Sequence, residues 1–311
     1  MMHGTFASLA IIAGLAMAAS ASAQTAPPAD PIVKENVTVK VAPHTYVIPD
    51  GNVGLVPNVG IIVGTRATLV IDPGLGRRNG EAVLREVAKV SKNTELYVAS
   101  THYHAEHTTG IAAFPTAKYV NATVQDEEQV RSGAALIKTF SGRSALTAEL
   151  LKDATVRKAD IAFDKSYTLD LGGVHVRFLV VGPTHTAGDT GFFVEEDSVL
   201  FSGDVVMNNS FLAATAVTSM RAWLTAFDTF AAMRPKTIVP SHGAVGDGSL
   251  IGVNQAMMQE VQELARDLKS QGRAADDTAT AVQAALVAKH PQWPRANGLA
   301  AAARAAYAEA P

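Results

Sequence analysis

The feature that most constrains this chain is the segment Thr101–His107, which contains three histidines and one glutamate. It follows directly after the apolar run Leu96–Ser100, which predicts a short buried strand. Functional loops of α/β proteins lie at the carboxyl ends of strands, so we expect these side chains at the edge of a sheet. Imidazole and carboxylate groups are ligands of zinc and other divalent metals, and burying four of them without a partner would be costly. The segment therefore predicts a metal site.

Composition narrows the function classes. The chain has 311 residues, enough for one large domain or two ordinary ones, and 48% of them are apolar. The formal net charge of −3 gives no basic surface for nucleic acid, so a small-molecule substrate is the expected partner. Cysteine is absent, which excludes disulfides, thiolate ligands and a cysteine nucleophile.

The N-terminus predicts export. Residues 1–23 are typical of a signal peptide, because the apolar run Phe6–Ala19 precedes Ala21-Ser22-Ala23, a small-x-small cleavage pattern. A run of about 14 residues is short for a membrane span, so we expect no stable membrane insertion after cleavage. A retained N-terminal anchor is the alternative. The mature protein is expected in the periplasm or secreted, with residues 24–36 as a flexible leader.

Residues 37–248 predict one main domain. The strand Ala67–Ile71, the helix Gly80–Ser91 and the strand Leu96–Ser100 follow each other, an order that predicts parallel pairing with a right-handed crossover. Residues 249–311 differ and predict a helical extension, which we interpret as packing or as a surface for homo-oligomers. The helices expected there are Gln255–Ser270, Ala279–Lys289 and Gly298–Ala310.

Three further segments repeat the order of strand, polar turn and ligand-type residue. They are Gly182–Asp189 with His185, Phe201–Asp204 with Asp204 at its end, and Val239–Gly243 with His242. A histidine or aspartate after a single strand is usually an ordinary loop residue. Together with the first segment, however, they contain five of the nine histidines, which favours one shared site.

The pattern His102-x-His104-x-Glu106-His107, followed by His185, Asp204 and His242, resembles the metallo-β-lactamase superfamily of dinuclear zinc hydrolases. The resemblance covers roughly residues 37–245. It implies an α+β fold, the αβ/βα four-layer sandwich, with a metal cleft along one edge of the two sheets. The helical extension would be an addition to that fold.

The resemblance also implies the ligands of two zinc ions per chain. Asp204 would bridge the ions, and Asp72 would support the histidine loop through a ligand imidazole. Glu106 stands where the family usually has aspartate, so either the backbone adjusts and Glu106 binds the second zinc, or that zinc is bound weakly. The implied ligands are His102, His104 and His185 for the first ion, with Glu106, His107 and His242 for the second.

The implied activity is metal-dependent hydrolysis of a cyclic amide, lactone or ester by a zinc-activated hydroxide, with β-lactams as the leading single substrate. Glu106 or Asp204 would pass the proton to the leaving group. An aspartate at the bridging position resembles the lactonase and thioesterase-like branches, because the first lactamase subclasses have cysteine there. Tyr103, Asn208 and Asn209 flank ligand positions and are either substrate contacts or ordinary loop residues.

The sequence leaves two other functional classes open. An iron-dependent oxidoreductase of the same fold is one, although His104 argues against the diiron flavin branch, which has a carboxylate there. A non-catalytic metal-binding accessory protein is the other. Loss of ligands would indicate it, and the ligand types here are nearly complete.

Overall fold

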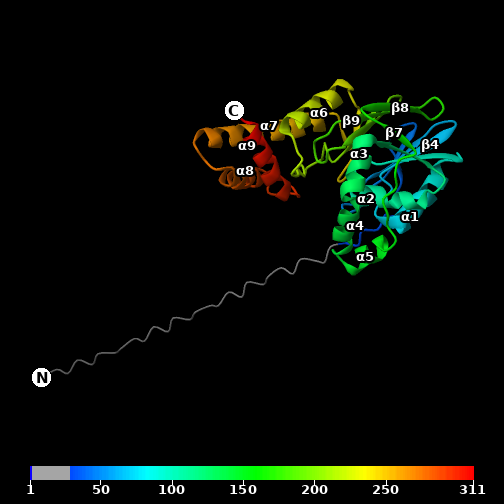
Figure 1. Cartoon of the computed structure of the whole chain (residues 1–311), viewed down its shortest axis with the longest axis horizontal. Coiled ribbons are helices and arrows are strands. Elements are labelled where there is room, and N and C mark those ends of the chain that lie inside the picture. The colour runs from blue at the N-terminus through cyan, green and yellow to red at the C-terminus, as the bar shows by residue number, and fades with distance from the viewer. Residues whose placement is uncertain (2–28) are drawn as a thin grey trace.

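Two β-sheets packed face to face form the centre of the protein, with helices on their outer sides (Figure 1). The structure is a computed structural model that describes Met1 and residues 29–311. The remainder of the predicted signal peptide and the first residues of the predicted leader lie outside the described residues.

The first sheet contains seven strands in sequence order. Its strands β4 and β5 run parallel, with Val70 opposite Val98, and helix α1 (Gly76–Val90) connects them. This arrangement confirms the predicted strand–helix–strand unit. The strands are β1 (Val39–Lys40), β2 (Thr45–Ile48), β3 (Val59–Val63), β4 (Ala67–Ile71), β5 (Glu95–Ala99), β6 (Lys118–Ala122) and β7 (Ile161–Phe163).

The second sheet has six strands in the order β13-β12-β11-β10-β9-β8. Strands β11 and β12 run parallel, so the segments with Asp204 and His242 leave the sheet at the same edge. The strands are β8 (Ser166–Asp170), β9 (His175–Val180), β10 (Thr190–Val194), β11 (Val199–Gly203), β12 (Thr237–Pro240) and β13 (Gly246–Asp247).

Separate hydrophobic clusters define the four layers. Leu69 of the first sheet packs with Phe178 and Phe192 of the second, in the interface between the sheets. Val83 of α1 packs with residues on the other face of the first sheet. Helix α6 (Met220–Ala232) packs on the other face of the second sheet with α7 (Ser249–Ser270), and Trp223 is fully buried there. The predicted αβ/βα sandwich is confirmed.

Short helices follow the histidine segment. One of these helices ends at Ser141, and Ser144 caps the next one by accepting a hydrogen bond from Thr147 N. The elements are α2 (Ala105–Thr108), the 3₁₀ turn η1 (Thr109–Ala113), α3 (Thr123–Glu128), the π turn η2 (Gln129–Gly133), α4 (Ala134–Ser141) and α5 (Ala145–Leu151).

The prediction of a flexible leader up to residue 36 is wrong for its second half. Val33 is 3% exposed, and its backbone N–H donates to Asn79 Oδ1 over 2.9 Å. Asn79 Nδ2 donates to Pro31 O (2.8 Å), and Asn36 N donates to Glu86 Oε1 (2.9 Å). Buried polar side chains of α1 thus satisfy the backbone of this segment, which fixes it against the helix.

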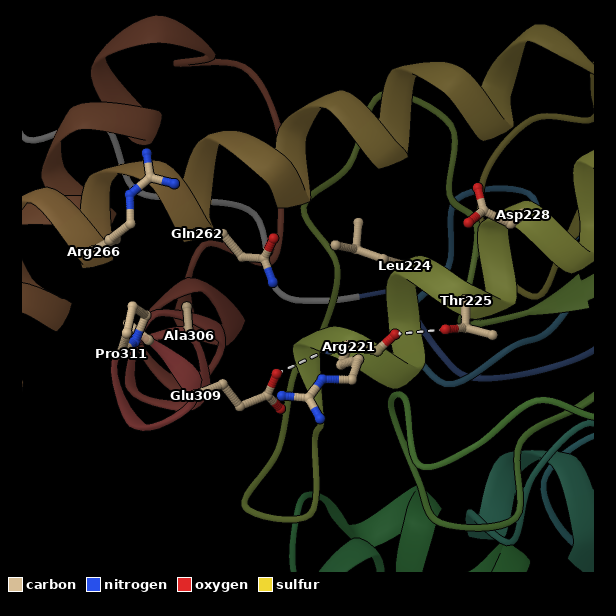
Figure 2. Close-up of a pocket in the computed structure, with 10 residues that line it drawn as sticks. Arg221, Leu224, Thr225, Asp228, Gln262, Arg266, Ala306, Glu309 and Pro311 are labelled. Atoms are coloured by element: carbon tan, nitrogen blue, oxygen red, sulfur yellow. Dashed lines mark hydrogen bonds between the residues drawn. The ribbon is translucent and has the colours of Figure 1, made fainter.

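The C-terminal extension packs onto the rest of its own chain. Its helices α7, α8 (Ala275–Lys289) and α9 (Asn297–Glu309) share one hydrophobic cluster with α6. Glu309 also caps α6, because its carboxylate accepts from the N–H groups of Met220 and Arg221, both over 3.0 Å. Figure 2 shows the contact with Arg221. Oligomerisation through these helices stays a prediction. Within residues 29–311, no helix combines the length and apolar character needed to cross a bilayer.

Candidate metal centre

The predicted ligand residues converge from four loops at the edge of the two sheets. They form two groups, and within each group the ligand atoms lie within 4.8 Å of one another. The members of the first group are His102, His104 and His185, and those of the second are Glu106, His107 and His242. This division is the same as that implied by the resemblance.

Asp204 lies next to both groups. Its Oδ2 is 3.8 Å from His185 Nε2, and its Oδ1 is 4.0 Å from His242 Nε2. The side chain is 5% exposed. A carboxylate placed in this way can share its two oxygens between two cations.

Several buried polar atoms of these residues have no hydrogen-bond partner among the described residues. The loss of hydration without a compensating partner is costly, so such atoms indicate a missing ligand. The atoms are His102 Nε2, Glu106 Oε2, both ring nitrogens of His107 and Asp204 Oδ1. For His107 Nδ1, the Asp72 carboxylate lies nearby at 3.0 Å as an ion-pair partner. Because nitrogen and carboxylate oxygen are the donors that divalent transition metals accept, the site fits a pair of such ions.

Two backbone carbonyl groups orient the histidines that flank Asp204. His242 Nδ1 lies 2.9 Å from Val56 O, and His185 Nδ1 is hydrogen-bonded to Ala213 O. Each Nδ1 is thereby the protonated nitrogen, which leaves Nε2 free to bind a metal. Val56 and Ala213 are far from the motifs in sequence, and a backbone carbonyl leaves no trace in residue type, so sequence analysis missed both.

Asp72 supports the histidine loop, in the place predicted for it. Its Oδ1 accepts from Thr101 N (2.7 Å) and its Oδ2 from Thr101 Oγ1 (2.8 Å). The same Oδ2 lies 3.0 Å from His107 Nδ1. Asp72 therefore fixes both the start of the loop and the ring of one candidate ligand.

The electrostatics of the site keep most of the imidazoles neutral. Burial and the neighbouring imidazoles hold the pKa values of His102 and His104 well below their ordinary range, and burial lowers the pKa of His242 to about 3. For His107, burial opposes the charged form, but the Asp72 carboxylate prevails and raises the pKa to about 9. Neutral imidazole is the form that binds metal.

Burial alone would raise the pKa of Asp204, but the guanidinium of Arg295 and the surrounding histidines hold it well below its usual range. For Glu106, burial outweighs the attraction of His107, whose Nε2 lies 3.9 Å from Glu106 Oε1, and raises the pKa of the carboxyl group. Its carboxylate nevertheless belongs to the second group of ligand atoms, so the longer side chain reaches the position that the resemblance gives to aspartate.

The three residues predicted to contact the substrate line two different pockets. Asn208 and Asn209 line a pocket of about 410 Å³ together with His242 and Arg295. Tyr103 does not line this pocket but a much smaller one, beside Gln129. Of the three residues, the two asparagines are therefore the better candidates for contact with a substrate.

Two polar residues that the sequence pattern did not single out hold the His242 loop. Asn58 Nδ2 donates to Pro240 O (2.8 Å) and Gly243 O (2.7 Å), and Asp50 Oδ2 accepts from Gly243 N (2.8 Å). The loop that they hold lies far away in sequence, so the residue types at these two positions do not by themselves indicate the contact.

The fold and the site define a class: a two-sheet sandwich with a candidate dinuclear metal centre at one edge. The family model of the metallo-beta-lactamase superfamily matches residues 53–242, more than half of the chain, so the protein belongs to that superfamily.

The chain is similar to curated fungal proteins. It is 26% identical over 217 residues to the lactamase-like protein vrtG of Penicillium aethiopicum, covering 66% of this chain and 59% of that protein. It is 24% identical over 235 residues to an atrochrysone carboxyl ACP thioesterase of Aspergillus fumigatus, covering 73% and 63%. The chain thus spans about 60% of the length of these relatives.

Among solved structures, a metallo-beta-lactamase from Pontibacter korlensis superposes with a TM-score of 0.57 and 19% identity, covering 71% of this chain and 98% of that one. A likeness at this identity shows the fold. Together with the family match, it places the chain among proteins that are mostly metal-dependent hydrolases.

Proposed function

We propose that this protein is a metal-dependent hydrolase that opens a cyclic amide, lactone or ester, with β-lactams as the first substrates to test. One observation supports the proposal above all others. Two groups of mostly neutral, buried ligand atoms flank one ionised carboxylate, Asp204. Zinc bound there would lower the pKa of a water to about 7 and polarise a carbonyl oxygen.

The residues of the chain have distinct parts in this proposal. The Val56 and Ala213 carbonyls and the Asp72 carboxylate hold three imidazoles in the orientation that ligation needs. Glu106 is suited to proton transfer, because burial raises its pKa and its Oε2 can therefore hold and release a proton. The Asn208 side chain is anchored by donation to Ala244 O (3.1 Å), at the wall of the pocket.

The choice of a carbonyl substrate is supported by the names of the relatives, lactamase-like protein and thioesterase, and by the absence of cysteine from the chain. Without a thiol, and with no serine in a Ser-His-Asp arrangement evident in the sequence, the metal centre is the natural source of the nucleophile.

The test combines metal content with hydrolysis. Purified protein is assayed on nitrocefin, a simple lactone and a thioester, before and after chelation, while its zinc and iron are measured by mass spectrometry. We expect turnover of at least one substrate that chelation abolishes and zinc restores, and that Asp204→Asn reduces by at least about a hundredfold. Failure of all three substrates with zinc present, or iron as the only bound metal, would contradict the proposal.

We also propose that the protein is exported and that it acts on a small molecule outside the cytoplasm. Support comes from the N-terminal pattern alone, the apolar run Phe6–Ala19 and the Ala21-Ser22-Ala23 motif. N-terminal sequencing of protein from a fractionated host should find Gln24 as the first residue in the periplasm or medium. Full-length protein retained in the cytoplasm would contradict export.

A further inference from the structure

The C-terminal extension reaches the metal centre through one side chain. Arg295 lies between α8 and α9, and its Nη1 donates to Asp204 Oδ2 over 2.9 Å. The Arg295 side chain is 29% exposed, whereas that of Asp204 is 5% exposed. Arg295 therefore joins the buried centre to solvent. It lies outside residues 53–242, so the family match assigns it no role.

We propose that Arg295 is a substrate-binding residue which holds a carboxylate of the substrate beside the metal centre. The inference rests on the proposed hydrolase function and narrows its substrates to acids whose free carboxylate lies a few bonds away from the bond to be cleaved. The guanidinium is planar and presents several N–H donors in a fork that matches a carboxylate, so this ligand class fits it best.

The charge distribution of the pocket supports this assignment. Among the residues that line the pocket of about 410 Å³, Arg295 is the one lysine or arginine. The pocket also contains Asp50, but that carboxylate is already engaged by the N–H groups of Asn52 (3.1 Å) and Gly243 (2.8 Å). An anion entering the pocket therefore finds a single cationic side chain of the protein, next to His242.

The guanidinium also has donors to spare. Among the described residues, its recorded hydrogen bond is the one to Asp204. A cation bound by Asp204 would neutralise that carboxylate and weaken its attraction for Arg295. The guanidinium would then lack its anionic partner, and a substrate carboxylate would supply one.

Packing fixes the position of Arg295. The neighbouring Pro294 O accepts a hydrogen bond from Phe211 N (3.2 Å), and the Trp293 ring lies 5.4 Å from the Phe211 ring, centroid to centroid. On the other side, a Cβ at Gly298 would lie 2.5 Å from Leu212 O, so the backbones are in close contact. The segment is therefore part of the pocket wall, and Arg295 keeps its left-handed φ of 67° because its surroundings hold it.

The test compares two esters that differ in one carboxylate. Zinc-loaded full-length protein is assayed on mono-4-nitrophenyl glutarate and on the neutral 4-nitrophenyl valerate. The wild type should favour the glutarate ester, and Arg295→Met should lower the ratio of the two kcat/KM values about tenfold or more, chiefly through KM. The matched control is Arg304→Met, which removes an exposed arginine of α9 that pairs with Asp276 and should leave the ratio unchanged.

A binding measurement separates this proposal from the hydrolase function. Glutarate is not hydrolysed, so calorimetry measures its affinity whether or not the esters turn over, and Arg295→Met should weaken it by about tenfold. If the wild type with zinc cleaves neither ester, the hydrolase proposal fails for these substrates and the calorimetry alone decides. An unchanged ester ratio together with an unchanged glutarate affinity would overturn the role of Arg295.

Zinc content and Tm are measured on every variant, because Arg295 also compensates the charge of Asp204. If Arg295→Met does not fold, Arg295→Lys replaces it. This variant keeps the positive charge but lacks the planar fork, so a smaller fall in the ester ratio is expected. A ratio equal to that of the wild type in Arg295→Lys would then count against carboxylate recognition by the fork.

Discussion

Nδ1 of His107 lies 3.0 Å from Oδ2 of Asp72, and both side chains are buried. Asp72 stands at the end of β4 and His107 in α2, so this contact links a strand of the first sheet to the loop with most of the candidate ligands. The affinity for metal should therefore depend on Asp72, although Asp72 is not itself a candidate ligand.

Asp72→Asn should weaken zinc binding by about 10- to 100-fold, because the neutral amide holds the His107 ring less firmly and no longer favours a fixed orientation. Competition with a chromophoric chelator measures the effect. Asp267→Asn, an exposed position in α7, is the matched control and should bind zinc like the wild type. Equal affinities of wild type and Asp72→Asn would show that the contact does not orient the ligand.

Glu106 allows a second prediction about the metals. Glu106→Gln keeps the size of the side chain but removes the charge, so the group with His107 and His242 loses its only carboxylate. We expect the variant to bind one zinc tightly and the second at least about tenfold more weakly, as judged by metal analysis after dialysis. Two tightly bound ions in Glu106→Gln would mean that Glu106 is not a ligand.

The sequence predicted the fold well where patterns are local. Strand β4, helix α1 and strand β5 were recognisable because their apolar patterns report directly on local structure. The predicted start of a helix at Gln255 was wrong, since α7 begins at Ser249. In the structure Asn254 is buried and bonds the backbone of Met207 through both its Oδ1 (3.1 Å) and its Nδ2 (2.8 Å).

The candidate ligands could be predicted for a similar reason, since each follows a strand and has a metal-binding side chain. The surroundings of the ligands could not. Arg295 stands between Pro294 and Ala296, a pattern typical of an exposed turn, and only the packing of the extension brings it to Asp204. The same packing could not be inferred from the alanine-rich sequence of α9, which indicates a helix but not its partner.

At Gly298 the backbone of α9 lies close to the backbone of Leu212 and Ala213. This contact predicts that the C-terminal extension helps to hold the candidate ligand His185 in place. A side chain at Gly298 would collide with the backbone of Leu212 and Ala213, and Ala213 O orients the His185 ring. Gly298→Val should therefore lower stability by about 1–3 kcal/mol, as expected for overpacking, and also reduce zinc affinity. Urea unfolding and zinc competition measure the two effects.

Gly252 of α7 provides the control for this substitution, because a Cβ there would meet nothing within 4 Å. Gly252→Ala should be neutral or slightly stabilising, since alanine favours the helix. If Gly298→Val lost stability but bound zinc like the wild type, the extension would not influence the centre through Ala213.

The carboxylate of Glu86 in α1 makes the free energy of unfolding depend on pH. Burial would raise its pKa, but hydrogen bonds from Lys89, Thr38 and the Asn36 backbone prevail and hold the pKa below the ordinary 4.5. A carboxylate whose folded pKa is depressed stabilises the protein above 4.5, and this contribution disappears as the pH falls from 4.5 through the folded pKa.

Glu86→Gln should accordingly destabilise the protein at neutral pH by about 1–2 kcal/mol, with a loss that shrinks as the pH falls below 4.5. Urea unfolding of wild type and variant from about pH 7 down to about pH 3 gives the two curves, which should converge at the acid end. Glu81→Gln, an exposed position on the same helix, should follow the wild type throughout. Parallel curves for wild type and Glu86→Gln would indicate that the Glu86 carboxylate titrates as it does in the unfolded chain, so that the N-terminal segment is held to α1 by packing alone.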